Sequence, residues 1–183
     1  MEKGSWLSKN YARLLAILFV VAITITIFLH RHNIAEFENL GYLGAFLVSL
    51  IGSATIILPA PGIIIIMALG TALPPVIVGL VAGTGAAVGE MTAYLAGFSG
   101  RGLVENRKLY DRLEGWLKKW GVGVIFVFAA TPLPFDILGI VAGILRYPPW
   151  KFFLACWFGK TTILIITAWL GAYWWEGLLR LFT

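Results

Sequence analysis

The chain has 183 residues, of which 60% are hydrophobic and only 13% are charged. A soluble domain of this size needs more charge to cover its surface, so we interpret the chain as an integral membrane protein. The length allows a handful of membrane spans in one compact bundle, and the single cysteine, Cys156, excludes a disulfide within the chain.

The formal net charge is +5, and the basic residues gather in a few segments. Lys3, Lys9 and Arg13 come before the first apolar run. Later clusters comprise Arg101, Arg107, Lys108, Arg112, Lys118 and Lys119, followed by Arg146 and Lys151. Because lysine and arginine concentrate on the cytoplasmic side, we expect a multi-pass protein of the plasma or inner membrane with a cytoplasmic N-terminus. A nucleic-acid partner is not expected, since no soluble module carries these charges.

The first apolar run, residues 11–29, is long enough to cross a membrane. No small-x-small cleavage site follows it, because the next residues are His30-Arg31-His32, so we expect a retained transmembrane helix. An outer interfacial segment completes the region 1–40. The histidine pair lacks a third ligand nearby, and neither a metal nor a cofactor is indicated.

Two Pro-x-Pro sequences divide later apolar runs: Pro59-Ala60-Pro61 and Pro132-Leu133-Pro134. Proline lacks an amide donor and clashes with the preceding turn, so each sequence predicts a break in a helix. The apolar arms beside the breaks, residues 42–58, 62–73, 121–131 and 135–145, are shorter than the roughly 20 residues that a crossing needs. We therefore expect two re-entrant hairpins with these prolines at their tips.

A full span is predicted after each hairpin, over residues 76–98 and 152–175, and each follows a Pro-Pro pair. The first is rich in glycine and alanine and contains two G-x-x-x-G steps, which let helices approach closely. We expect it at the centre of the bundle, although a dimer contact through these glycines stays open.

Between the halves, residues 103–120 have the pattern of an amphipathic helix, with Leu109, Leu113, Trp116 and Trp120 at helical spacing. We expect this helix to lie on the inner leaflet and to bind anionic head groups. The basic residues for that contact are Arg107, Lys108, Arg112, Lys118 and Lys119. An ordinary solvated linker helix is the alternative.

The proline and glycine positions of the two halves correspond. Pro59, Pro61 and Gly70 map onto Pro132, Pro134 and Gly143 with one constant offset. The predicted fold is therefore an all-α membrane domain over residues 41–183. Repeat 1 covers about 41–98, the amphipathic linker 99–120, and repeat 2 about 121–175. One crossing separates the hairpins, so the repeats have inverted topology, an arrangement that supports alternating access.

Three ionisable side chains, Glu90, Asp136 and Lys160, lie within apolar runs. A charge in the membrane costs about 3 kcal/mol, so such residues are candidates for substrate binding or gating. Tyr94 follows Glu90 by one helical turn and joins this set. The alternatives are a buried Asp136–Lys160 ion pair that only fixes packing, and a Glu90 that lies near the cytoplasmic interface.

The sequence gives little support for an enzyme. Gly97-Phe98-Ser99-Gly100 resembles the serine motif of intramembrane serine proteases, but no histidine follows His32 to act as a base. No H-E-x-x-H or phosphate-loop motif is present either.

Several of these residues together resemble the DedA family, also called the VTT or SNARE-associated Golgi protein family. The resemblance covers roughly residues 40–175. It rests on Gly85-x-x-x-Gly89-Glu90-x-x-x-Tyr94-x-x-Gly97, on both Pro-x-Pro sequences, on Ala142-Gly143 and on Gly159-Lys160. The better-known members have an acidic residue where this chain has Gly62, and arginines around the second hairpin, where it has Ala129, Ala130 and Asp136.

The resemblance implies an inner-membrane protein with two facing re-entrant hairpins that moves phospholipid or polyprenyl-phosphate lipid between leaflets. Our first hypothesis is accordingly a flippase-like or scramblase-like lipid transporter. The alternative is a structural or assembly protein whose hairpins pack against a partner without transport. The lipid, the direction, the ion coupling and the oligomeric state stay open.

Overall fold

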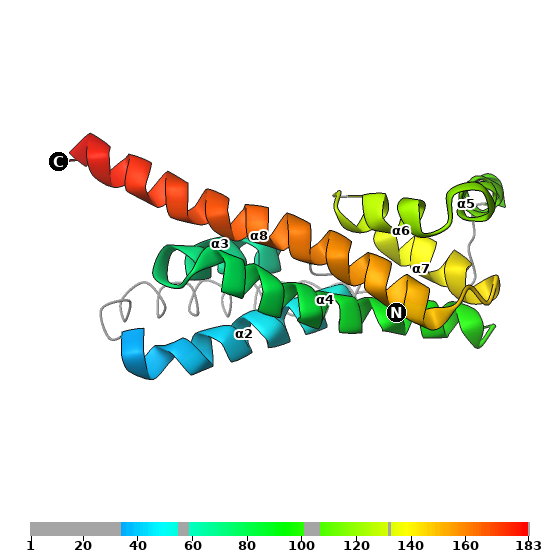
Figure 1. Cartoon of the computed structure of the whole chain (residues 1–183), viewed down its shortest axis with the longest axis horizontal. Coiled ribbons are helices and arrows are strands. Elements are labelled where there is room, and N and C mark those ends of the chain that lie inside the picture. The colour runs from blue at the N-terminus through cyan, green and yellow to red at the C-terminus, as the bar shows by residue number, and fades with distance from the viewer. Residues whose placement is uncertain (1–33, 55–58, 101–106, 132, 183) are drawn as a thin grey trace, which may run out of the picture.

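The computed structural model describes residues 34–54, 59–100, 107–131 and 133–182. All secondary structure in these ranges is helical, which confirms the predicted all-α class (Figure 1). The helices are α2 (Ile34–Ala54), α3 (Pro59–Ala72), α4 (Pro75–Phe98), α5 (Arg107–Trp120), α6 (Val122–Ala129), α7 (Phe135–Ile144) and α8 (Pro149–Phe182). The N-terminal transmembrane helix predicted over residues 11–29 lies outside the described residues.

Two of these helices, α4 and α8, are long and apolar enough to cross a membrane, over Pro75–Phe98 and Pro149–Trp174. Each begins at the second proline of a Pro-Pro pair, where a missing amide donor costs nothing. The corners have the same backbone hydrogen bonds, because the carbonyls of Pro74 and Pro148 each accept two amides from the first helical turn. Both predicted spans are confirmed as helices.

The helix breaks at the Pro-x-Pro sequences differ in detail from the prediction. α6 ends at Ala129 and α7 begins at Phe135 with Pro134 as its N-cap, which confirms the second break. At the first, α3 begins at Pro59, so Pro59 and Pro61 lie in the first helical turn and not between two helices. Proline is tolerated there because the first amides of a helix have no intrahelical partner.

Of the four arms around these breaks, α2 has 21 residues and begins at Ile34, so it is longer than the predicted arm 42–58 and long enough to span a bilayer at about 1.5 Å per residue. The other three are too short to cross a bilayer singly. α3 has 14 residues, α6 has 8 and α7 has 10. At about 1.5 Å per residue, each is shorter than the roughly 30 Å hydrocarbon layer. Along the long axis of the molecule, α2 and α3 lie toward one end, and α6 and α7 lie toward the other (Figure 1).

The short helices pack on the long ones through glycine. α2 packs along α4 and α6 along α8, whereas α3 packs on α8 and α7 packs on α4. At Gly70, Gly97, Gly143 and Gly171 an added Cβ would collide with a backbone carbonyl of the facing helix. These carbonyls belong to Ala168, Ile140, Tyr94 and Met67, respectively. Glycine therefore sets the distance between the layers, and the expected central position of α4 is confirmed.

Helix α5 is amphipathic, as predicted, and covers one end of the bundle. Leu113 and Leu117 are buried in a hydrophobic cluster with residues of α6 and α7. Trp116 and Trp120, expected on the same apolar stripe, stay 46% and 65% exposed. The reason is geometric: α6 and α7 cover only a narrow strip of α5, and the tryptophans flank it.

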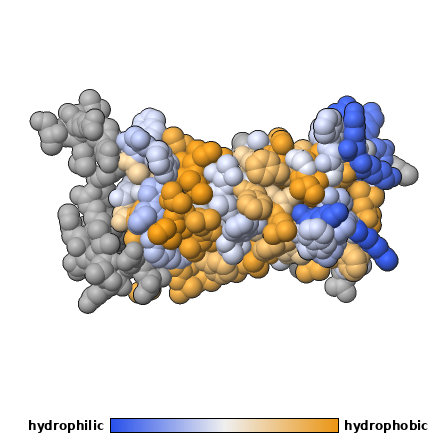
Figure 2. Space-filling model, in the orientation of Figure 1, coloured by the Kyte–Doolittle hydropathy of each residue, from blue (hydrophilic) through white to orange (hydrophobic). Residues whose placement is uncertain are grey.

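The middle of the molecule has an apolar exterior (Figure 2). Exposed large hydrophobic side chains occur on every long helix, for example Leu43, Val88, Leu95, Ile166 and Trp169. Hydrophilic residues concentrate at the end that carries α5. Such a continuous apolar belt marks a surface that contacts lipid or another protein.

Replacing Gly97 by alanine should lower the stability of the protein. The new Cβ would collide with the carbonyl oxygen of Ile140, and backbone cannot move aside easily, so we expect a loss of about 1–3 kcal/mol. Gly115→Ala on the exposed face of α5 is the control, because its Cβ meets nothing within 4 Å. It should stabilise by about 1 kcal/mol through helix propensity. Thermal unfolding in detergent measures both, and equal effects would contradict the packing described.

Candidate functional site

A buried ion pair joins the two long helices. Lys160 Nζ on α8 lies 2.6 Å from Glu90 Oε1 on α4, and the side chains are 20% and 4% exposed. The other carboxylate oxygen, Oε2 of Glu90, has no hydrogen-bond partner among the described residues. A buried charge left unpaired costs several kcal/mol, so each member of this pair requires the other.

This pairing corrects the expectation that Lys160 pairs with Asp136. Asp136 is near enough to interact electrostatically with Lys160, but the direct contact belongs to Glu90. The physical reason is burial. Asp136 is half-buried in the first turn of α7, whereas Glu90 is almost fully enclosed. The more desolvated carboxylate gains most from the cation.

Lys160 lies against the end of the α6–α7 hairpin. Its Nζ is 5.1 Å from the centroid of the Phe135 ring, a cation–π contact. The preceding residue, Gly159, allows Ala129 and the amide of Ala130 to approach α8 closely. The hairpin end is partly open, since Leu133 and Pro134 are exposed. Lysine, aspartate and a broken helix therefore meet at one place.

The residue before Glu90 lies against the end of α2. Gly89 packs on the Leu50 carbonyl and the Ser53 side chain in the last turn of that helix. Each member of the ion pair therefore directly follows a glycine on which the end of a shorter helix packs. The side chains of Pro59 and Pro61, and all of Pro132, lie outside the described residues, so these three predicted tip residues are not placed.

The structure gives Tyr94 a partner away from the charged cluster. Its hydroxyl donates a hydrogen bond of 2.5 Å to the carbonyl of Tyr147, and its ring lies 5.1 Å from that of Phe152. These contacts fasten α4 to the corner between α7 and α8. The expectation that Tyr94 joins Glu90 rested on helical spacing alone, which does not determine where a long side chain reaches.

Sequence reasoning missed one hydrogen bond and one buried hydroxyl between the long helices. Trp157 Nε1 donates a 2.9 Å hydrogen bond to the hydroxyl of Thr84. Thr161 is buried against Gly83, and its hydroxyl has no partner among the described residues. A tryptophan in the middle of a predicted span was the available signal, since a buried indole N–H needs an acceptor. Thr131, by contrast, caps its own helix by donating to the carbonyl of Val127.

A double-mutant cycle on Glu90→Gln and Lys160→Met tests the ion pair. Each single change should cost about 3–5 kcal/mol because it leaves a buried charge alone. The double variant should lose less than the sum, with a coupling energy of about 1–3 kcal/mol. Thermal or denaturant unfolding in detergent gives these values.

The matched control is Lys118→Met. It breaks the exposed Lys118–Glu114 pair on α5, which has the same 2.6 Å separation, and should leave unfolding unchanged because water screens the contact. Additive effects at Glu90 and Lys160 would contradict a direct pair.

Comparison with known proteins agrees with this architecture. The family model described as the VTT domain matches residues 59–173, which include both ion-pair residues and Asp136. The chain is 28% identical over 68 residues to an uncharacterized HI0703 homolog from Histophilus somni, an alignment that covers 37% of this chain and 35% of that protein. No solved structure matches. With well over half of its length matched, the chain belongs to the VTT domain family.

Proposed function

We propose that this chain is a membrane lipid transporter, flippase-like or scramblase-like, that moves phospholipid or polyprenyl-phosphate lipid between leaflets. The observation that carries the proposal is the cluster of Glu90, Lys160 and Asp136 at an interrupted helix inside an apolar bundle. Charged groups are retained at such places when something polar must pass or bind there.

The two halves support an inverted repeat. In α3, Met67 contacts Gly171 of α8 and Gly70 contacts Ala168 of α8. The residues 73 positions later in α7 make the corresponding contacts with α4: Ile140 contacts Gly97 and Gly143 contacts Tyr94. In each half the short helix thus packs on the long helix of the other half. We interpret α2–α3 and α6–α7 as re-entrant hairpins that enter from opposite faces, with their ends near the middle of the membrane.

In this scheme a lipid head group passes the end of the α6–α7 hairpin while its acyl chains stay in the bilayer. Asp136 is half-exposed and offers a carboxylate, and the part of Lys160 that remains accessible offers a cation. Glu90 holds Lys160 in place and returns it to its resting position. Rocking of one half against the other would open the cluster to one leaflet at a time.

The alternative, a structural or assembly protein, is favoured by one feature: Glu90 and Lys160 already neutralise each other. Asp136 favours transport, because a pure packing role would give this carboxylate a direct cationic partner, and no salt bridge within the described part of the chain includes it. We place the end that carries α5 on the cytoplasmic side of the plasma or inner membrane, since its basic residues fit the positive-inside rule. No reaction is proposed.

Reconstitution into liposomes with leaflet-labelled lipid tests this function. The full chain should move labelled phospholipid or polyprenyl phosphate faster than empty liposomes do. Asp136→Asn should slow this movement about tenfold, the value of one charged hydrogen bond, with an unchanged melting temperature. Asp111→Asn on the exposed face of α5 is the control and should transport normally.

Transport at the empty-liposome rate would contradict the proposal. An Asp136→Asn variant that loses transport and thermal stability together would favour the packing role.

A further inference from the structure

Three basic side chains lie over aromatic rings at the end of the molecule that carries α5. Lys119 Nζ is 5.4 Å from the Trp120 ring centroid and Lys151 Nζ is 5.3 Å from that of Trp150. The Arg146 guanidinium carbon is 5.7 Å from the centroid of Phe98. All three rings are more than half exposed. We call these residues the basic collar: Phe98, Lys119, Trp120, Arg146, Trp150 and Lys151.

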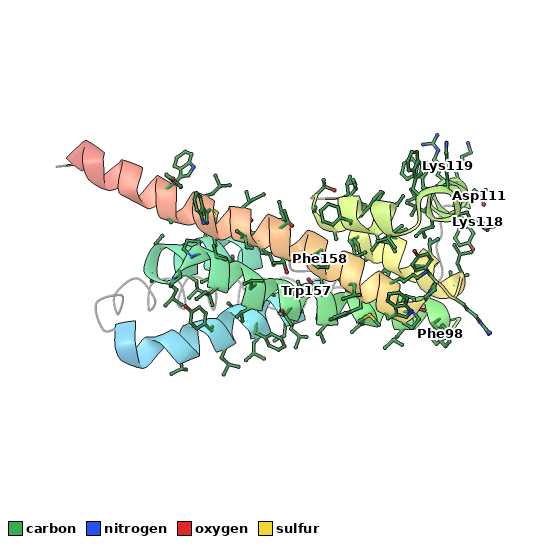
Figure 3. All side chains as sticks on the ribbon, viewed as in Figure 1. Phe98, Asp111, Lys118, Lys119, Trp157 and Phe158 are labelled. Atoms are coloured by element: carbon green, nitrogen blue, oxygen red, sulfur yellow. The ribbon has the colours of Figure 1, made fainter. Side chains whose placement is uncertain are left out.

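The collar residues come from α4, α5, the α7–α8 corner and the start of α8, and these parts lie at the same end of the molecule (Figure 1). Tyr147 lies in the corner between α7 and α8, and its carbonyl accepts the Tyr94 hydroxyl of α4. The Tyr147 hydroxyl lies close to Gly121, the residue that follows α5. A Cβ added to Gly121 would be 3.1 Å from this hydroxyl. Figure 3 labels Lys119 and Phe98 at this end, and Figure 2 colours it hydrophilic beside the apolar belt.

The cations of the collar are available for a ligand. The described residues of α5 include two acids, Asp111 and Glu114, and Glu114 is already bound by Lys118. No salt bridge among the described residues involves Lys119, Arg146 or Lys151. Exposed tryptophan beside unpaired lysine and arginine is the composition of a membrane–water interface with anionic lipid.

Arg146 gives an independent indication. Its φ is +50°, the only positive value at a non-glycine position among the described residues. It follows the C-cap of α7, where its amide donates to Gly143 and that of Tyr147 donates to Ala142. This is the helix-terminating position that glycine normally occupies, because L side chains are strained there. An arginine retained at such a position indicates a role for its side chain.

We propose that the basic collar binds the phosphate groups of anionic phospholipids in the leaflet that it faces, and that Arg146 is a phosphate-binding residue. The planar guanidinium group of Arg146 can donate two hydrogen bonds to a phosphodiester, and the tryptophan rings of the collar can lie between the lipid head groups. The inference rests on the membrane placement proposed above and is independent of lipid transport.

Titration of the purified full chain in a neutral detergent tests the collar. The ligands are phosphatidylglycerol and phosphatidylcholine with the same acyl chains, and native mass spectrometry counts the bound lipid. Phosphatidylglycerol should bind more tightly. Arg146→Gly should weaken its binding about fivefold and leave phosphatidylcholine unchanged. Because glycine relieves the strained backbone, the melting temperature of this variant should be equal or higher.

Gly115→Ala on the exposed face of α5 is the control and should bind phosphatidylglycerol like the native chain, since it changes no charge and its Cβ meets nothing within 4 Å. Equal affinity of the native chain for the two lipids would overturn the proposal, as would undiminished phosphatidylglycerol binding by Arg146→Gly. A chain that binds as expected but fails to move lipid in liposomes would contradict only the transport proposal.

Discussion

A helix that stops inside an apolar protein leaves amide and carbonyl groups without partners, and lipid cannot supply them. This constraint determines much of the structure. The ends of α2 and α6 are covered by α4 and α8 at Gly89 and Gly159, where the absence of a side chain lets backbone approach backbone. Four further glycines bring α3 and α7 onto the long helix of the other half.

The charged cluster follows from the same arrangement. The residues directly after Gly89 and Gly159 are Glu90 and Lys160, so the ion pair between the long helices lies next in sequence to both of these packing points. Low dielectric makes this pair strong and also makes each unpaired member costly. The pair leaves one carboxylate oxygen without a hydrogen bond among the described residues. The proposed exchange of partners with a lipid head group would use this spare acceptor capacity.

Proline and glycine allowed parts of the fold to be predicted from the sequence, because both residues act on the local backbone. The features predicted in this way are the Pro-Pro corners, the break before α7 and the close packing of the glycine-rich α4. The partner of Lys160 could not be read in this way. It depends on how far α4 and α8 slide past each other, which is set by contacts such as Gly83 with Thr161. The same holds for Tyr94, whose hydroxyl reaches the α7–α8 corner.

The amphipathic pattern of α5 was also only partly informative. Periodicity identified an apolar face, but it could not separate Leu113, which packs on protein, from Trp120, which stays exposed beside Lys119. That division depends on the width of the surface offered by α6 and α7. It leaves both tryptophans exposed, as the proposed position of α5 at a membrane–water interface requires.

Nitroxide labels that report depth in the bilayer test the central claim most directly. Labels would be placed at Ala54→Cys and Leu133→Cys, the accessible ends of the two interrupted segments, and at Lys118→Cys as an interfacial reference. The native Cys156 is fully buried and would stay silent. The account predicts that both tip labels lie near the middle of the bilayer, exposed to oxygen more than to a polar relaxant. A tip label at the depth of the Lys118 label would contradict it.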